Sequence, residues 1–340
     1  MKHLIGWHLL ERDDWERALE ASLHHARAGH AWNRRAEGKS LCLMFFNPSL
    51  RTRTSMEVAA AQLGAHVTTV SPGSGTWQMA FEDGTVMDGV EAEHIQEAVG
   101  VLSRYFDAIG VRVFASLTDY TRDSGEHLIS RFARAAQVPV VNLESAFYHP
   151  CQELADASAI VEHFDGDTRG RRFVLSWCYH PKALPMAVPN SALMSAARLG
   201  MEVVVARPDG FALDDNVMQS ARIYAEQSGG SITEVDDMAA AFEDANVIYA
   251  KAWGGRQVYV DPAAEAELRA AHRDWRVTEE RMASTADGIF MHCLPVRRNV
   301  VVDDAVLDGP SAIHLRQAEF RLFAQKAILE MVWNLDRVPA

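Results

Sequence analysis

The segment FFNPSLRTRTS, residues 45–55, brings serine, threonine and arginine side chains together directly after an apolar run. This order predicts a buried strand, a polar turn and then the start of a helix. The first N–H groups of a helix have no partner within it, so Ser49 to Thr52 are candidates for binding a phosphate. Arg51 could add a charge-assisted contact. The simpler alternative is a capped helix with exposed arginines, and a Walker loop is excluded because the Gly-Lys-Ser/Thr ending is absent.

Residues 149–153, HPCQE, combine two hydrogen-bond donors within one helical turn. Pro150 suits the first turn of a helix, which would place His149 and Gln152 on the same side. Both can donate to a carbonyl oxygen that gains negative charge, and the motif therefore predicts oxyanion stabilisation. The alternative is a buried structural histidine with a capping glutamine. Cys151 has no base nearby in the sequence, so we interpret it as a packing residue and not as a nucleophile.

Residues 292–299, HCLPVRRN, predict a strand end whose carbonyl groups face a ligand. Pro295 interrupts the strand, so the carbonyl oxygens of Cys293 and Leu294 would be available to accept hydrogen bonds from an –NH2 group. A nucleophilic Cys293 is the alternative, but no neighbouring residue in the sequence would lower the pKa of its thiol.

Apolar runs of strand length alternate with segments of helical periodicity along the chain. Strands are expected at residues 40–46, 65–71, 108–114, 138–144, 172–177, 201–208, 245–253, 288–295 and 311–317. Helices are expected at 53–65, 92–106, 190–200, 237–245 and 324–335. This alternation predicts an α/β protein with two domains, each on a mainly parallel sheet. Ligands of such sheets bind beyond the carboxyl ends of the strands, so a cleft between the domains is expected to be lined by NPSLRTRT, RVFAS, ESAFYHPCQE, CYHPK, KAWGG and HCLPVRRN.

The composition narrows the classes of partner. The chain has 340 residues and a formal net charge of −13, which argues against nucleic acid or an anionic membrane surface as a partner. No apolar run approaches the ~18 residues of a membrane span, and no signal peptide is evident. The 4 cysteines lack CxxC spacing and no credible metal-ligand cluster stands out, so a reduced, cytoplasmic protein without a metal or cofactor is expected.

The motifs SLRTRT, HPCQ and HCLP, in this order, resemble the aspartate/ornithine carbamoyltransferase family, and the resemblance covers nearly the whole chain. It implies two doubly wound parallel-sheet domains with the site between them. Residues 1–150 would bind carbamoyl phosphate, residues 151–317 would bind the amino-acid substrate, and the helix at 318–340 would pack back on the first domain. The resemblance also implies a homotrimer and a knotted second domain, in which the chain near Lys251 threads the loop at 178–186.

Several further segments resemble the branch that acts on N-acylornithine. The Ser-Met-Gly motif of the ordinary ornithine enzymes is absent, and KAWGG stands near its expected place. HCLPVRRN, TVMDGVEAEHI and YHPKALPMAVPNSAL are also similar to this branch. Acetyl-preferring relatives carry glutamate and lysine where this chain has Ala92 and Val301. A glutamate beside the acyl tail would repel a succinyl carboxylate, so Ala92 favours N-succinyl-L-ornithine over N-acetyl-L-ornithine.

The resemblance carries specific site residues with it. The implied contacts of carbamoyl phosphate are Ser49, Leu50, Arg51, Thr52, Trp77, Arg112, His149, Pro150, Cys151, Gln152, Cys293, Leu294 and Arg321. Arg112, His149, Gln152 and Cys293 would take part in catalysis, and Trp77 would reach into a neighbouring subunit. The implied contacts of the acylornithine are Glu144, His180, Lys182, Lys251, Leu294 and Arg297. The family's AENR reads AEFR here, and Phe320 therefore puts the role of Arg321 in doubt. Arginine biosynthesis is the implied setting, and a silent subunit that binds carbamoyl phosphate without turnover is the non-enzymatic alternative.

Overall fold

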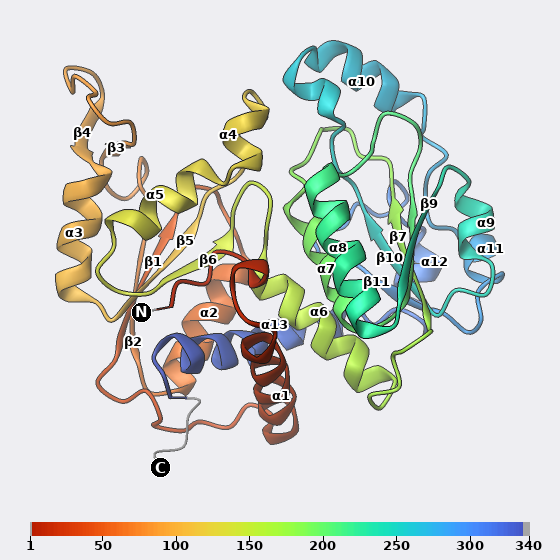
Figure 1. Cartoon of the computed structure of the whole chain (residues 1–340), viewed down its shortest axis with the longest axis horizontal. Coiled ribbons are helices and arrows are strands. Elements are labelled where there is room, and N and C mark those ends of the chain that lie inside the picture. The colour runs from red at the N-terminus through yellow and green to blue at the C-terminus, as the bar shows by residue number, and fades with distance from the viewer. Residues whose placement is uncertain (1, 336–340) are drawn as a thin grey trace. The chain divides into compact units, whose positions relative to one another are not determined.

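The chain forms two compact units in a computed structural model, which describes residues 2–335 (Figure 1). Unit 1 comprises the residues up to Ser116, Thr121–Ala155 and those from Phe320 onward, and unit 2 comprises Leu117–Tyr120 and Asp156–Glu319. The later boundaries fall inside two long helices, α6 (Pro150–His163) and α13 (His314–Val332).

Unit 1 is built on a four-stranded parallel sheet with the order β2-β1-β5-β6. Its strands are β1 (Ser40–Phe45), β2 (His66–Val70), β5 (Ala108–Arg112) and β6 (Val140–Glu144). They confirm the strands expected from the apolar runs in the first half of the chain. The other elements of unit 1 are the 3-10 helix η1 (Trp7–Leu9), α1 (Arg12–Ala28), α2 (Arg51–Gln62), β3 (Gln78–Ala80), β4 (Glu91–His94), α3 (Ile95–Tyr105), α4 (Tyr120–Ser124) and α5 (His127–Ala135).

The core of unit 1 lies between the sheet and helices α3 and α5. Ile95 and Val99 of α3 recur at helical spacing and join Ile129 and Phe132 of α5 in one buried cluster with the strand residues. This apolar contact fixes the strands, and the loops that follow β1, β5 and β6 are positioned as a consequence.

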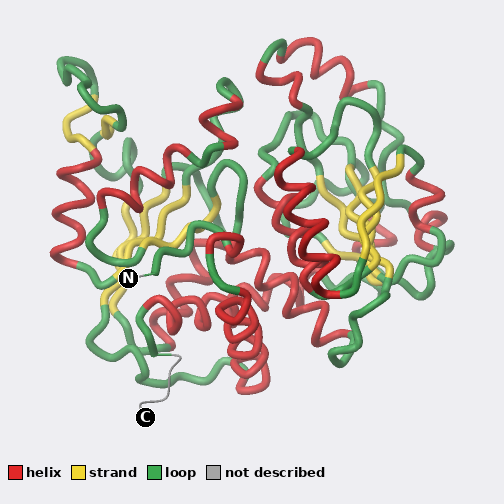
Figure 2. The backbone as a smooth tube through the Cα atoms, viewed as in Figure 1, coloured by secondary structure: helices red, strands yellow, loops and turns green. Residues whose placement is uncertain are grey.

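Unit 2 contains a five-stranded parallel sheet with the order β11-β10-β7-β8-β9. Its strands are β7 (Arg172–Trp177), β8 (Glu202–Ala206), β9 (Ser231–Val235), β10 (Val247–Lys251) and β11 (Ile289–Met291). Its helices include α7 (Ala187–Arg198), α8 (Asp215–Ser228), α9 (Met238–Phe242), η2 (Arg256–Tyr259), α10 (Pro262–Ala270), α11 (Glu279–Met282) and α12 (Asp304–Leu307). Figure 2 shows strands lying among helices in each unit.

The strand predicted at residues 311–317 is wrong. Ala312 forms only an isolated bridge to Phe290, and α13 begins at His314. Strand β9 was not predicted, because at the edge of its sheet it has no fully buried residue and therefore no apolar run. The helix expected at residues 92–106 is shorter, since β4 occupies its first residues.

The strand orders create one switch point in each sheet. In unit 1 the chain passes from β1 outward to β2 and then returns to β5 on the other side of β1. In unit 2 it runs from β7 outward to β9 and returns to β10 beside β7. The loops after the two strands at a switch point diverge and leave room for a ligand. These loops carry Ser49 to Thr52 and Phe114 in unit 1, and His180 and Ala252 in unit 2.

Candidate active site

Helix α2 presents its N-terminus directly after the loop that follows β1. The helix begins at Arg51, and the Ser49 hydroxyl accepts a hydrogen bond from the Thr52 N–H at 3.1 Å. Leu50 stands at the cap position with its side chain exposed. The predicted turn and helix start are therefore present at residues 49–52, and the positive end of the helix dipole lies there.

Arg321, on α13, forms hydrogen bonds with residues of both α2 and α6. Its guanidinium donates to the Thr52 hydroxyl at 3.0 Å and to the Gln152 side-chain oxygen at 2.7 Å. Arg321, Thr52 and Gln152 are all buried. The preceding Phe320 lies in the core, edge-on to Phe323. Phe320, which stands where the resemblance leads us to expect asparagine, thus does not prevent Arg321 from contacting Thr52 and Gln152.

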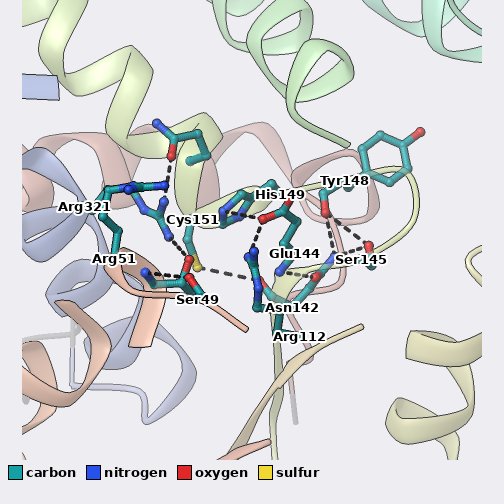
Figure 3. Close-up of polar contacts among 12 residues, drawn as sticks. Ser49, Arg51, Arg112, Asn142, Glu144, Ser145, Tyr148, His149, Cys151 and Arg321 are labelled. Atoms are coloured by element: carbon teal, nitrogen blue, oxygen red, sulfur yellow. Dashed lines mark hydrogen bonds and ion pairs between the residues drawn. The ribbon is translucent and has the colours of Figure 1, made fainter. Parts of the chain in front are cut away.

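Arg112, Glu144 and His149 lie together in a compact polar group (Figure 3). The Arg112 guanidinium donates to a Glu144 carboxylate oxygen, and the same oxygen lies 3.5 Å from His149 Nε2. A bulge between β5 and β6 pairs Arg112 with Glu144. The guanidinium also stacks 4.4 Å from the centre of the Phe114 ring. Glu144 is predicted to bind the acylornithine. It instead contacts Arg112 and His149, the two residues predicted to bind a carbonyl oxygen.

His149 stands immediately before helix α6, as the motif predicts. Its carbonyl oxygen accepts hydrogen bonds from the N–H groups of Gln152 and Glu153 at 2.9 and 3.0 Å. Pro150 occupies the first turn, and its carbonyl accepts a bond from the Trp7 indole at 2.9 Å. Cys151 points into the core, where its thiol lies 3.6 Å from the Asn142 carbonyl, and burial raises its pKa to about 11. Such a thiol is unreactive near neutral pH.

Three residues that hold the loop before His149 are not singled out by the sequence motifs. Asn142 and Ser145 lie at the end of β6 and just beyond it, and Glu126 stands before α5. They hold the loop of residues 145–148, which leads to His149. No motif marks them, because Glu126 is far from the loop in sequence and the residue types are common.

Unit 2 brings together three of the four predicted basic side chains, His180, Lys251 and Arg297, around the switch point. Arg297 Nε donates to His180 Nε2 at 2.9 Å. With that nitrogen accepting, His180 Nδ1 carries the proton and donates to the Lys182 carbonyl at 2.8 Å. Burial lowers the His180 pKa, and the charges of Arg297 and Lys251 lower it further. Lys182 contributes its carbonyl group to this contact, and its side chain is exposed.

The paired arginines of HCLPVRRN have different partners. Arg297 contacts His180, whereas Arg298 binds Asp304 and Asp308 on and after α12. Strand β11 ends at Met291, before Cys293 and Leu294, and both of these residues are half-buried. The Leu294 N–H donates to His292 Nδ1 at 2.8 Å, so the turn at the predicted carbonyl site is fixed from within.

Trp77, Ala92 and Val301 are singled out in the sequence but belong to none of the contacts described above. Trp77 is largely exposed, and its indole donates to the Glu93 carboxylate on β4 at 2.7 Å. Ala92, also on β4, is exposed. Val301, in contrast, is buried in unit 2.

Within residues 2–335, no group of three or more His, Cys, Asp and Glu side chains is arranged to hold a metal ion, and no helix is long and apolar enough to cross a membrane.

Family models match both halves of the chain. The carbamoyl-P binding domain of aspartate/ornithine carbamoyltransferase matches residues 2–162, and the Asp/Orn binding domain of the same family matches residues 186–332. The chain therefore belongs to the aspartate/ornithine carbamoyltransferase family and is a carbamoyltransferase, as its motifs predict.

The relatives of this chain include enzymes that are named for N-acylornithine substrates. The chain is 45% identical to the N-acetylornithine carbamoyltransferase of Xanthomonas campestris pv. campestris, over 97% of this chain and 98% of that protein. It is 35% identical to the N-succinylornithine carbamoyltransferase of Bacteroides fragilis, over 96% of each chain. A solved N-acetyl-L-ornithine transcarbamylase variant, with one glutamate replaced by alanine, is complexed with carbamyl phosphate and N-succinyl-L-norvaline. It superposes with a TM-score of 0.92 at 43% identity, covering 97% of this chain and 99% of that one.

Proposed function

We propose that the protein transfers the carbamoyl group of carbamoyl phosphate to the δ-amine of N2-succinyl-L-ornithine, giving N-succinyl-L-citrulline and phosphate. The observation that carries the transfer is the connected set of buried donors in unit 1. Arg321 joins Thr52 to Gln152, Gln152 lies one helical turn from His149, and His149 shares Glu144 with Arg112. The relatives named above support an N-acylornithine as acceptor.

The donors divide naturally between the two ends of carbamoyl phosphate. The phosphate suits the N-terminus of α2 at residues 49–52 together with Arg51 and Arg321, because backbone N–H groups, the helix dipole and guanidinium groups all favour an anion. The carbamoyl oxygen suits Arg112 and His149, which can stabilise the negative charge that develops during attack. To unit 2 we assign the carbamoyl –NH2, through the carbonyl groups of Cys293 and Leu294.

The reaction needs few proton transfers by the protein. The neutral δ-amine attacks the carbamoyl carbon, a C–N bond forms, and the bond from that carbon to the phosphate oxygen breaks. Inorganic phosphate leaves and takes up the proton that the amine loses. The protein contributes positioning and electrostatic stabilisation, and neither requires a metal or an organic cofactor.

We assign the acceptor's carboxylates to the cationic group of unit 2. Arg297 is exposed beside a neutral His180, and the Lys251 charge acts on the same imidazole. A guanidinium held through Nε keeps its terminal nitrogens available for a carboxylate. Lys182 is exposed on the same loop and adds a further cation.

The choice of succinyl over acetyl rests on Ala92. A glutamate at this position would oppose the second carboxylate of a succinyl group, whereas alanine does not. The solved relative with glutamate replaced by alanine, bound to N-succinyl-L-norvaline, supports this reading. The higher identity to N-acetylornithine enzymes favours the alternative, N-acetyl-L-ornithine. We also propose that Trp77 acts at the site of a neighbouring subunit in a homotrimer, and that the product enters arginine biosynthesis.

The experiment is product formation from carbamoyl phosphate with N-succinyl-, N-acetyl- and free L-ornithine as acceptors. The proposal expects a carbamoylated product and inorganic phosphate in equal amounts, with the succinyl compound used best. Use of the acetyl compound alone would contradict the role of Ala92 while leaving the carbamoyl transfer intact. Binding of carbamoyl phosphate without product from any acceptor would support a silent binding subunit.

A further inference from the structure

A buried carboxylate holds the loop that leads to His149. Glu126 accepts hydrogen bonds from the Ser145 hydroxyl and, at 2.9 Å, from the Phe147 N–H. The backbone N–H groups of Ala146 and Tyr148 also lower the pKa of this carboxyl group. Two residues of the 145–148 loop therefore donate to one side chain, and the residue that follows the loop is His149.

Glu126 is itself fixed in an unusual conformation. The residue is 7% exposed, and its backbone adopts φ 51°, in the left-handed region, just before α5. Residues with a Cβ atom adopt this region rarely. Its N–H donates to the Asp123 carbonyl at 3.1 Å, and its carbonyl accepts from Ser130. A strained backbone conformation persists only where surrounding contacts stabilise it. Here the stabilising contact is that of the Glu126 carboxylate with the loop.

Asn142 holds the same loop from the strand side. Its amide nitrogen donates to Ser145 Oγ at 2.7 Å and to the Tyr148 carbonyl at 3.2 Å, and its amide oxygen accepts from the Glu144 N–H at 2.9 Å (Figure 3). The loop is thus held at the Ser145 hydroxyl and the Phe147 N–H by Glu126, and at the Tyr148 carbonyl by Asn142. The His149 imidazole, 3.5 Å from Glu144, follows this loop directly in the chain.

We propose that Glu126 is a positioning residue for carbamoyl transfer, and that it orders residues 145–148 so that the His149 imidazole meets the carbamoyl oxygen. This inference rests on the role given to His149 in the proposed function. Burial raises the pKa of Glu126 to about 7 while its hydrogen bonds lower it. The hydrogen bonds from this loop favour the charged carboxylate, whereas burial favours the neutral acid.

The first test is Glu126→Gln, which keeps the side-chain shape but replaces one acceptor oxygen by an NH2 group that faces N–H donors. We expect kcat to fall by about 10- to 100-fold, because small displacements of a catalytic group have effects of this size. The affinity for inorganic phosphate, measured by calorimetry, should change by less than about twofold, because the phosphate is assigned to α2 and Arg321. Ser145→Ala, which removes one donor, should give a smaller loss of kcat.

Glu330→Gln provides a matched control. Glu330 is also a buried carboxylate of unit 1, paired with His25 and Arg35 on the side of α13. Its replacement should lower the thermal midpoint without the selective loss of kcat. An equal loss of kcat in both variants would mean that Glu126 matters only for stability, and this result would overturn the proposal.

A double-mutant cycle decides whether Glu126 acts through His149. In a His149→Ala background, Glu126→Gln should have little further effect on kcat, because the group that it positions is gone. Additive losses would contradict the proposal.

A readout independent of activity uses protein labelled with 15N at histidine. Glu126→Gln should shift the ring signals of His149, identified by their loss in His149→Ala, and leave those of His25 unchanged. Unshifted His149 signals would refute positioning by Glu126, whereas absence of carbamoyl transfer in the unaltered protein would refute the proposed function alone.

Discussion

Arg112 and Glu144 lie opposite each other on neighbouring parallel strands because a bulge between β5 and β6 shifts their register. The bulge leaves Leu143 without a partner on β5 and brings the carboxylate onto the guanidinium, where His149 also lies. Glu144 therefore contacts both of the donors that we assign to the carbamoyl oxygen. Carbamoyl phosphate must compete with an internal carboxylate for Arg112.

Glu144→Gln should strengthen the binding of a carbonyl-containing ligand. The amide is a weaker partner for Arg112 than the carboxylate, so phosphonoacetamide, a stable analogue of carbamoyl phosphate, should bind about tenfold more tightly. Inorganic phosphate has no carbonyl group and serves as the control ligand, with little change expected. Calorimetric titration of both ligands measures the difference. Equal changes for the two would show that Glu144 does not compete at the carbonyl position.

Arg321→Lys should weaken the binding of carbamoyl phosphate. Lysine keeps the positive charge but cannot bridge the Thr52 hydroxyl and the Gln152 oxygen with two nitrogens of one planar group. We expect the KM for carbamoyl phosphate to rise about 10- to 100-fold, corresponding to the loss of one or two charge-assisted hydrogen bonds. Arg316→Lys on the same helix, whose partners are Glu162 and Glu319 at the surface, is the control. An unchanged KM in Arg321→Lys would remove this residue from the site.

His180 should make the stability of the protein depend on pH. Its pKa in the folded state lies below the ordinary value of 6.5, chiefly because of burial. The unfolded chain thus binds the proton more readily, and the contribution of His180 to stability is present above pH 6.5 and lost as the pH falls through the lowered pKa. The thermal midpoint should therefore drop less between neutral and mildly acidic pH in His180→Gln than in the unaltered protein. An equal drop in both would contradict this assignment.

Among the cysteines, Cys293 should react first with iodoacetamide in the folded protein. Burial raises the pKa of Cys151 to about 11 and those of Cys42 and Cys178 to about 12, whereas Cys293 is half-buried. Reaction requires an accessible thiolate, so peptide mapping at mildly alkaline pH should find the label at Cys293. Carbamoyl phosphate and the acylornithine together should slow the labelling if this residue contacts them. Label at Cys151 in folded protein would mean that the core of unit 1 opens readily.

The sequence predicts the strands and the site loops of this protein well where burial is complete. Apolar runs mark β1, β5, β7 and β10, and the charged loops follow them at the carboxyl ends of parallel strands. The family could be recognised because SLRTRT, HPCQ and HCLP are short contiguous motifs. Prediction fails at β9, where an edge strand is only partly buried, and at 311–317, where a short apolar stretch precedes the helix that begins at His314.

The supporting contacts of the site could not be predicted from the sequence. The register shift that pairs Arg112 with Glu144 depends on how two strands meet, and nothing in either segment signals it. Glu126 reaches Ser145 and Phe147 only through the fold, since α5 separates them along the chain. Sequence motifs thus identified groups expected to touch the substrate, whereas the residues that orient them emerged only from the structure.

The most direct measurement is kcat/KM for N-succinyl-L-ornithine and N-acetyl-L-ornithine, side by side, in the unaltered protein and in Ala92→Glu. The proposed function predicts a preference for the succinyl compound in the unaltered protein. It also predicts that Ala92→Glu lowers succinyl use by about 10- to 100-fold through repulsion between carboxylates, with a much smaller effect on acetyl use. A preference for the acetyl compound that Ala92→Glu leaves unchanged would contradict the assignment of N-succinyl-L-ornithine as the substrate.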